Sequence, residues 1–155
     1  MNNEDVRIVR LEPQRVAVSY GFGPGPESIA WEKMIAFVKE KGLDRDGQAH
    51  RYLGFNNPNP APGSPNYGYE QWVTVSPEVT AAGDIKIKNF EGGLYAVARC
   101  RLENIFDRWQ ALAAWREKSP YRTGNHQWLE EVLTPPLDEP ITEKMEVDLY
   151  LPIAE

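Results

Sequence analysis

Apolar residues recur at helical spacing near the start of the chain, which predicts an amphipathic helix over residues 27–41. Positions i, i+3, i+4 and i+7 of a helix lie on one face, and that face packs on the rest of the protein. The residues at these positions are Trp31, Met34, Ile35 and Val38. Gly42 follows directly, and glycine is the usual residue just beyond a helix end.

A second helix is expected from Ile105 to about Lys118, before Pro120, which cannot continue it. Its apolar face is formed by Ile105, Trp109, Leu112 and Ala113. Trp31 and Trp109 lie at similar places in the two helices, and we expect both to anchor a helix against a sheet. Other segments alternate apolar and polar residues, as strands do. The expected strands are 6–12, 16–18, 51–55, 69–75, 85–91, 95–97, 127–133 and 145–151.

These elements occur twice in the same order, at a nearly constant offset. Ala17 and Ala96 are 79 residues apart, and Glu70 and Asp148 are 78 apart. We therefore predict two βαββ repeats, residues 5–80 and 84–154, related by pseudo-two-fold symmetry within one domain of residues 1–155. The fold class is α+β, with an antiparallel sheet, two long helices on one face and a ligand cleft on the other.

Strand alternation then places seven aromatic and acidic side chains on the faces away from the helices. These candidate ligand-binding residues are Tyr52, Glu70, Trp72, Trp128, Glu130, Asp148 and Tyr150. Aromatic rings stack on a planar ligand, and a carboxylate among them prefers a cation. The pattern predicts an aromatic, acid-lined pocket for a small organic molecule. The alternative is a solvent-exposed sheet face with scattered acidic residues.

Composition excludes several other classes of protein. The 155 residues carry a formal net charge of −6 and no basic stripe, so we expect no meaningful affinity for duplex DNA. The single cysteine, Cys100, cannot form an internal disulfide and lies in an apolar stretch, which predicts a buried thiol. The polar N-terminus resembles no signal peptide, and no apolar run is long enough to span a bilayer, so a cytoplasmic protein without a membrane partner is expected.

Familiar catalytic and metal-binding motifs are missing from the sequence. His50 and His126 are isolated, and no spacing of Cys, His or acidic residues matches a metal motif, so neither a metal nor a cofactor is expected. The glycine-rich segment 21–26 lacks the lysine and spacing of a P-loop and is better explained as a turn into the first helix.

Four segments carry a resemblance to a known family, and the resemblance covers the chain from Val6 to Ile153. They are residues 91–97, the helix 105–118, the segment 128–130 and the closing strand 147–153. In order and spacing they are similar to the GyrI-like small-molecule-binding domain. That family has a doubled βαββ architecture and occurs alone or behind the DNA-binding helices of multidrug-responsive regulators. This sequence has no helix-turn-helix segment, so the resemblance implies a stand-alone member.

The resemblance also implies roles for individual residues. In the family, a glutamate in the strand after the second helix meets cationic, aromatic effectors deep in the pocket. Glu130 matches it by position, although the adjacent Glu131 leaves the register open by one residue. Asp148 matches an acidic position in the last strand, with Tyr150 beside it.

Three functions follow from the resemblance. The first is a binding protein that senses or sequesters lipophilic, aromatic and often cationic molecules. The second is a hydrolase that opens cyclopropane-bearing genotoxic natural products, in which Glu130 would activate water as a general base. The third, inhibition of gyrase, rests on analogy with the founding member alone. No catalytic residue is assigned outside the hydrolase alternative.

Overall fold

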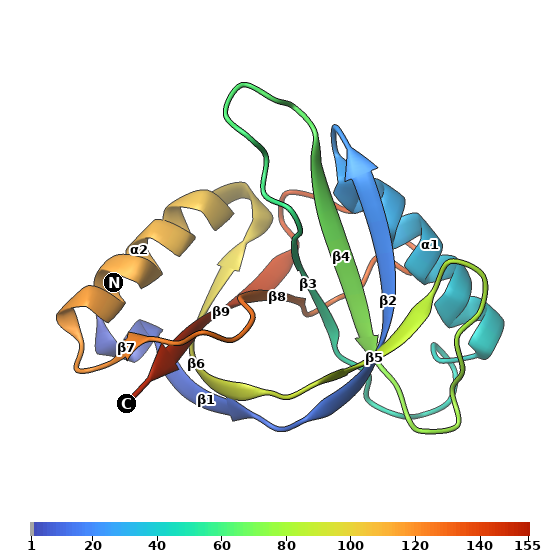
Figure 1. The fold of residues 1–155 in the computed structure, drawn as a ribbon, viewed down its shortest axis with the longest axis horizontal. Helices are drawn as coiled ribbons and strands as arrows, with labels where there is room; N and C mark the ends of the chain where they lie inside the picture. Colours follow the sequence, from blue (N-terminus) through green and yellow to red (C-terminus); the bar gives the residue numbers. More distant parts are fainter. Residues whose placement is uncertain (1) are drawn as a thin grey trace. The chain divides into compact units, whose positions relative to one another are not determined.

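A computed structural model of the chain describes residues 2–155, and its elements follow the order predicted from sequence (Figure 1). The helical elements are η1 (Asn3–Asp5), α1 (Pro26–Lys41), η2 (Leu102–Asn104) and α2 (Ile105–Lys118). The strands are β1 (Arg7–Leu11), β2 (Gln14–Gly23), β3 (Tyr52–Asn56), β4 (Tyr67–Thr74), β5 (Lys86–Phe90), β6 (Gly93–Arg101), β7 (Arg122–Thr123), β8 (Leu129–Val132) and β9 (Glu146–Ala154). Every pairing between these strands described below is antiparallel.

The described chain divides into two compact units, each containing one long helix. The first, called the α1 unit, comprises residues 14–90 and 136–139. The α2 unit comprises the described residues up to Pro13 together with residues 91–135 and 140–155. Each unit is therefore completed by a strand from the other half of the sequence, because β1 pairs with β6 and β5 pairs with β2.

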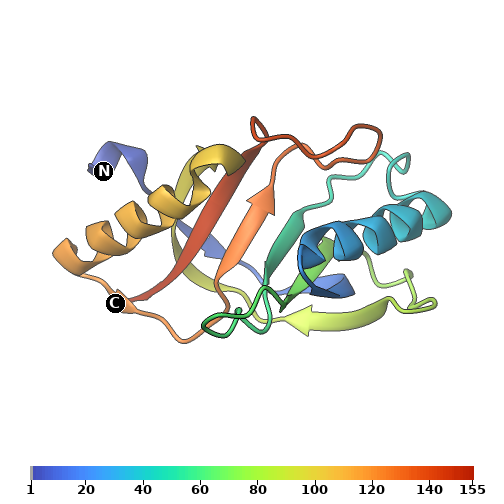
Figure 2. The ribbon, with the colours of Figure 1, turned by 90° about the horizontal axis from the view of Figure 1, so that it is seen from above.

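In the α1 unit the strands are ordered β3-β4-β2-β5, and α1 packs on β2 and β4 (Figure 2). The helix begins at Pro26, whose fixed φ suits the first helical position, and it ends at Gly42, which has a left-handed φ of 70°. The Ser19 hydroxyl donates a hydrogen bond of 2.7 Å to the carbonyl of Ala30 and so fixes β2 to the helix. Ser19 therefore points toward the helix. Its neighbours Val18 and Tyr20 point to the opposite face of the sheet.

In the α2 unit the strands are ordered β1-β6-β9-β8, and β7 pairs separately with β9. The helix α2 contacts β6 and β9 (Figure 2). Its residue Leu112 is fully buried. Alternation along β9 places Val147, Leu149 and Leu151 on the face that receives α2, as predicted. Asp148 and Tyr150 point from the opposite face.

The α+β class, the antiparallel pairing and both helices are confirmed, and α2 has the predicted bounds. The short strand β7 was not predicted, because two residues carry no readable alternation. The helix α1 contacts β2 and β4, and the helix α2 contacts β6 and β9. Superposition of residues 5–80 on 84–154 stays a prediction, as does the single-domain organisation. No helix among the described residues is long and apolar enough to cross a membrane.

Candidate functional site

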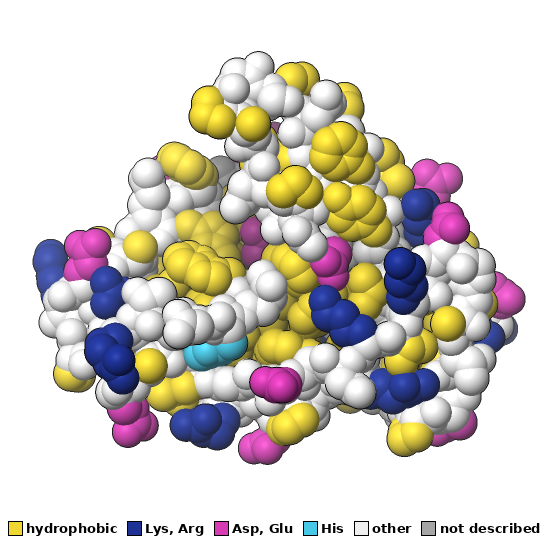
Figure 3. Space-filling model, in the orientation of Figure 1, with side chains coloured by type: hydrophobic (Ala, Val, Ile, Leu, Met, Phe, Trp, Pro, Cys, Tyr) yellow, Lys and Arg dark blue, Asp and Glu magenta, His cyan; other side chains and the backbone are white. Residues whose placement is uncertain are grey.

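Two aromatic rings contact the Trp72 ring on the face of the α1 unit opposite its helix. Trp72 of β4 meets Phe55 of β3 edge-on, with ring centroids 5.1 Å apart, and meets Phe90 of β5 at 5.2 Å. All three residues are buried. In Figure 3, apolar, basic and acidic side chains lie together over the region of β4 and β5. Trp72 was a predicted site residue, and the structure gives it two ring partners that sequence alternation did not identify.

Glu70 lies beside these rings and accepts hydrogen bonds from three side chains. The donors are Trp72 Nε1 at 3.0 Å, Asn57 Nδ2 at 2.6 Å and Lys88 Nζ at 3.2 Å. Burial alone would raise the pKa of the Glu70 carboxyl, but the hydrogen bonds from Trp72 and Asn57 and the charge of Lys88 outweigh burial and lower the pKa. Glu70 is therefore ionised at neutral pH and forms the acidic side of an aromatic cluster.

The predicted orientation of Tyr52 is wrong. Tyr52 pairs in register with Val73, and its ring stacks on Trp31 of α1 at 5.9 Å, so it lies on the helix face and not beside Glu70. Burial, followed by the nearby Asp44 and Asp46, raises the pKa of its hydroxyl to about 12. Leu53 and Phe55 occupy the opposite face instead. Alternation in β3 could not decide this, because both faces of the strand carry apolar residues.

A second group of predicted residues lies in the α2 unit, on the face opposite its helix. The Tyr150 hydroxyl donates a hydrogen bond of 2.6 Å to Glu131 Oε1, and both residues are buried. The Tyr150 ring meets Tyr95 of β6 edge-on at 5.4 Å, and Tyr95 in turn meets His126 at 4.8 Å. Burial raises the pKa of the Tyr95 hydroxyl above its usual range, so this hydroxyl stays protonated. A buried carboxylate thus lies in an aromatic corner, as the sequence predicted, although Tyr95 was missed.

The carboxylate in that corner is Glu131, not Glu130, and the predicted placement of Glu130 beside Tyr150 is corrected by the structure. In the register of β8 with β9, Glu131 pairs with Asp148, whereas Glu130 pairs with Leu149 of the helix face. Sequence alternation could not choose between the two faces, because each face of β8 carries one apolar residue and one glutamate. Pairing with β9 decides the register, and a shift of one residue exchanges the faces.

Trp128 lies on the helix side together with Glu130, which corrects its predicted placement on the opposite face. Its ring meets Trp109 of α2 with centroids 5.4 Å apart, and 43% of its surface is exposed. Trp128 therefore extends the packing of α2 and does not face Tyr150. Whether Trp128 or any of the other predicted site residues contacts a ligand stays a prediction.

Asp148 is buried on the predicted face but is held by two arginines. Arg7 Nη2 lies 2.8 Å from Asp148 Oδ2, and Arg99 Nε lies 2.9 Å from Oδ1. Burial alone would raise the pKa of the Asp148 carboxyl, but the hydrogen bonds from Arg99 and Arg7 outweigh it and lower the pKa. The same contact raises the pKa of Arg99. The charge of Asp148 is thus balanced by two arginines, one on the neighbouring strand β6 and one on β1.

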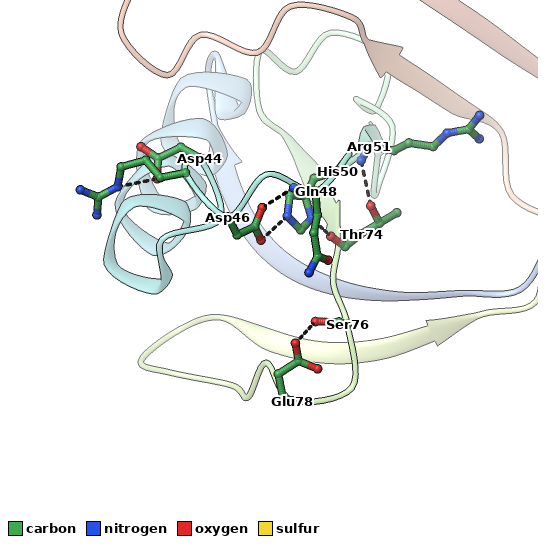
Figure 4. Close-up of polar contacts among 9 residues, drawn as sticks. Asp44, Asp46, Gln48, His50, Arg51, Thr74, Ser76 and Glu78 are labelled. Carbon is green, nitrogen blue, oxygen red and sulfur yellow. Dashed lines mark hydrogen bonds and ion pairs between the residues drawn. The ribbon is translucent and has the colours of Figure 1, made fainter.

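Both ring nitrogens of His50 have partners within the chain (Figure 4). Nδ1 lies 2.7 Å from the Thr74 carbonyl, and Nε2 lies 2.7 Å from Asp46 Oδ2. Hydrogen bonds from the Gln48 backbone and the His50 side chain lower the pKa of Asp46. His50 thus ties the loop before β3 to β4, and the described residues contain no group of three potential metal ligands.

Two further features of the α2 unit bear on the search for a site. Cys100 is buried, and burial raises the pKa of its thiol to about 11, so it is unsuited to nucleophilic attack. A hollow of about 540 Å³ lies on the helix side, between the N-terminal segment and α2. Trp115 and Tyr121 form part of its wall, and its described lining includes Lys118 but no carboxylate. This hollow does not match the predicted acid-lined pocket.

A model of a known protein family matches most of the chain. Residues 7–153 match the family model Cass2, described as integron-associated effector binding protein. The chain belongs to this effector-binding family. The match confirms the resemblance to GyrI-like effector-binding domains, and the family binds small molecules as effectors. No curated protein matches the sequence significantly.

Solved structures of low sequence identity share the fold of this effector-binding chain. The C-terminal domain of EcmrR superposes with a TM-score of 0.72 at 11% identity, covering 97% of each chain. In the complex of EcmrR with DNA, the chain spans 57% of the EcmrR polypeptide. A hydrolase from Listeria innocua gives a TM-score of 0.69 at 11% identity, covering 97% of this chain and 92% of the other. A protein bound to tetraphenylphosphonium gives 0.55 at 10% identity, covering 96% and 93%.

Proposed function

We propose that the protein captures a lipophilic, aromatic cation and that Glu131 is the residue that selects the cation's charge. The observation that carries this proposal is the position of Glu131, buried at 2.6 Å from the Tyr150 hydroxyl, with the Tyr95 ring packed against Tyr150. Capture of this kind serves either sensing or sequestration, both of which fit an effector-binding family.

The physical argument concerns the cost of a buried negative charge. A carboxylate that is removed from water gains more from a cation than an exposed one does, because the surrounding medium screens the attraction less. The faces of the Tyr95 and Tyr150 rings carry partial negative charge and attract the same cation. Charge, aromatic surface and burial therefore favour one class of ligand together.

A neighbour in fold supports the proposal independently of these residues. The protein solved with tetraphenylphosphonium is similar to this chain over nearly its whole length, and its ligand is a lipophilic aromatic cation. The part of EcmrR that shares this fold is its C-terminal domain.

Tetraphenylphosphonium and tetraphenylborate have nearly the same shape and opposite charge, so they form a matched pair of probes. In calorimetric titrations of the wild-type protein, we expect the cation to bind and the anion to bind about 100-fold more weakly or not at all. A single charge-assisted contact is worth roughly 1.5–3 kcal/mol, and this sets the expected ratio. Equal affinity for the two probes would show that shape and apolar surface alone select the ligand.

Hydrolysis is a second candidate function, favoured by the direct contact of Glu131 with a tyrosine hydroxyl and by similarity in fold to a protein described as a hydrolase. Glu131, in place of the predicted Glu130, would take a proton from water while the oxygen adds to a carbon of a strained cyclopropane ring. The ring bond would break, Tyr150 would supply a proton to the other carbon, and the proton taken up by Glu131 would pass to the Tyr150 oxygen 2.6 Å away. Several moles of ring-opened product per mole of protein, measured by chromatography, would establish turnover. Stoichiometric binding without product would leave capture as the function.

A further inference from the structure

The ammonium group of Lys88 lies inside the aromatic cluster of the α1 unit. Its Nζ is 4.6 Å from the centre of the Trp72 ring and 5.7 Å from that of Phe55. The same atom is 3.2 Å from Glu70 Oε1. Two ring faces and a carboxylate are the elements from which proteins build sites for organic ammonium ions.

We propose that Phe55, Trp72 and Glu70 form a second cation site, called the cage, and that Lys88 is its built-in occupant, which an organic ammonium ion displaces. The inference rests on the proposed function, because it assumes that this protein binds cationic effectors. It extends that function to a different set of residues and to a more compact chemical group.

The carboxylate of the cage is prepared for a cation by contacts that do not involve Lys88. Trp72 and Asn57 donate hydrogen bonds to Glu70 at 3.0 and 2.6 Å and hold it against the rings. Only 13% of the Glu70 side chain is exposed. If Lys88 leaves, Glu70 keeps its two neutral donors and its position, and its charge becomes available to another cation.

Lys88 is well placed to leave. It lies in β5, which is at one end of the strand order, and 43% of its side chain is exposed. Rotation about its own side-chain bonds returns the ammonium to water without a change in the backbone. Its ion pair is partly screened by solvent, so the contact that must be broken is a weak one.

The geometry also defines the chemical class of the displacing ligand. A quaternary ammonium group presents methyl groups to the Trp72 and Phe55 rings and its charge to Glu70, and it needs no hydrogen-bond donor. The expected ligand is therefore a compact organic ammonium ion or a larger molecule that carries one. An inorganic cation would gain little from the two rings, because it would have to give up water to reach them.

Tetramethylammonium is the probe for the cage, because it has the required group and no ring of its own. If the Lys88 ammonium occupies the cage about 90% of the time, tetramethylammonium binds the wild type about tenfold more weakly than it would bind an empty cage. We therefore expect Lys88→Met to bind tetramethylammonium about tenfold more tightly than the wild type. Adding Glu70→Gln to Lys88→Met should abolish this gain.

Lys86→Met is the matched control, because it removes the same charge from the same face of β5. Lys86 is exposed, and among residues 2–155 it makes no ion pair or ring contact. This variant should bind tetramethylammonium within about twofold of the wild type. Equal affinity of the Lys88→Met and Lys86→Met variants, or weaker binding by Lys88→Met, would overturn the inference.

Nuclear magnetic resonance tests the same displacement in the unaltered protein. The ε-methylene protons of Lys88 should be shifted upfield by the Trp72 ring and should return toward random-coil values as tetramethylammonium is added. No movement at saturation would overturn the inference. The proposed function has a separate readout: it fails if tetraphenylphosphonium does not bind the wild type, whatever the result at Lys88.

Discussion

Replacing Glu131 with Gln is expected to weaken the binding of tetraphenylphosphonium by about 10- to 100-fold. The amide oxygen of Gln can still accept the hydrogen bond from Tyr150, so the variant removes the charge and keeps the contact. A charge-assisted interaction is worth roughly 1.5–3 kcal/mol, which converts to this range of affinity. Calorimetric titration of both proteins at the same ionic strength measures the ratio.

Glu130→Gln is the control for this experiment, because it removes the same charge from the neighbouring residue. Glu130 lies on the face of β8 that is shared with Leu149 and α2, so its variant should bind within about twofold of the wild type. If Glu130→Gln loses the affinity and Glu131→Gln keeps it, the ligand binds on the Glu130 face of β8 and the proposed role of Glu131 is wrong. If neither variant loses affinity, a buried carboxylate of β8 is not what selects the cation.

Asp148→Asn is expected to lower the free energy of unfolding at pH 7 by about 2–3 kcal/mol. The carboxylate is buried, whereas its partners Arg7 and Arg99 are 53% and 54% exposed, so solvent screens part of the interaction. Removing a buried charged partner costs more free energy of unfolding than removing one partner of a surface ion pair. We therefore expect a loss of at least about 2 kcal/mol. Urea denaturation measures the change. Glu146→Gln, at an exposed position of the same strand, should change stability by less than about 0.5 kcal/mol.

The effect of Asp148 should also depend on pH in a definite direction. Its pKa in the folded protein is lowered, so the stability it contributes is fully present above the unfolded value of about 3.9. That contribution is lost as the pH falls through the folded pKa. The difference in stability between the wild type and Asp148→Asn should hold from pH 7 to 5 and shrink below about pH 4. A difference that stays constant down to pH 3 would show that the ionised carboxylate is not its source.

The apolar pattern was sufficient to predict both helices and the order of the strands. In α2 the periodic apolar residues and the closing Pro120 gave the observed bounds, and Gly42 ended α1 as predicted. The face of β9 was also readable, because Val147, Leu149 and Leu151 are all apolar while Asp148 between them is charged. Where one face of a strand is uniformly apolar, burial leaves a single choice of register.

The same reasoning failed where both faces of a strand carry similar residues. In β3, Tyr52 and Phe55 are both aromatic and lie on opposite faces, and in β8 each face carries one glutamate. Period-two alternation separates the faces of such a strand but does not say which one meets the helix. The pairing of β3 with β4 and of β8 with β9 made that choice.

Sequence alone determined the family, the α+β class and the presence of carboxylates among aromatic residues, because these follow from local periodicity and the order of motifs. Tertiary structure decided which carboxylate is held by which partner. Arg7 reaches Asp148 across 141 positions of sequence, and Lys88 reaches Glu70 across 18. Strand pairing brings such residues together, and no local pattern encodes the distance between them. For this reason the ammonium in the aromatic cage and the choice of Glu131 over Glu130 became visible only in three dimensions.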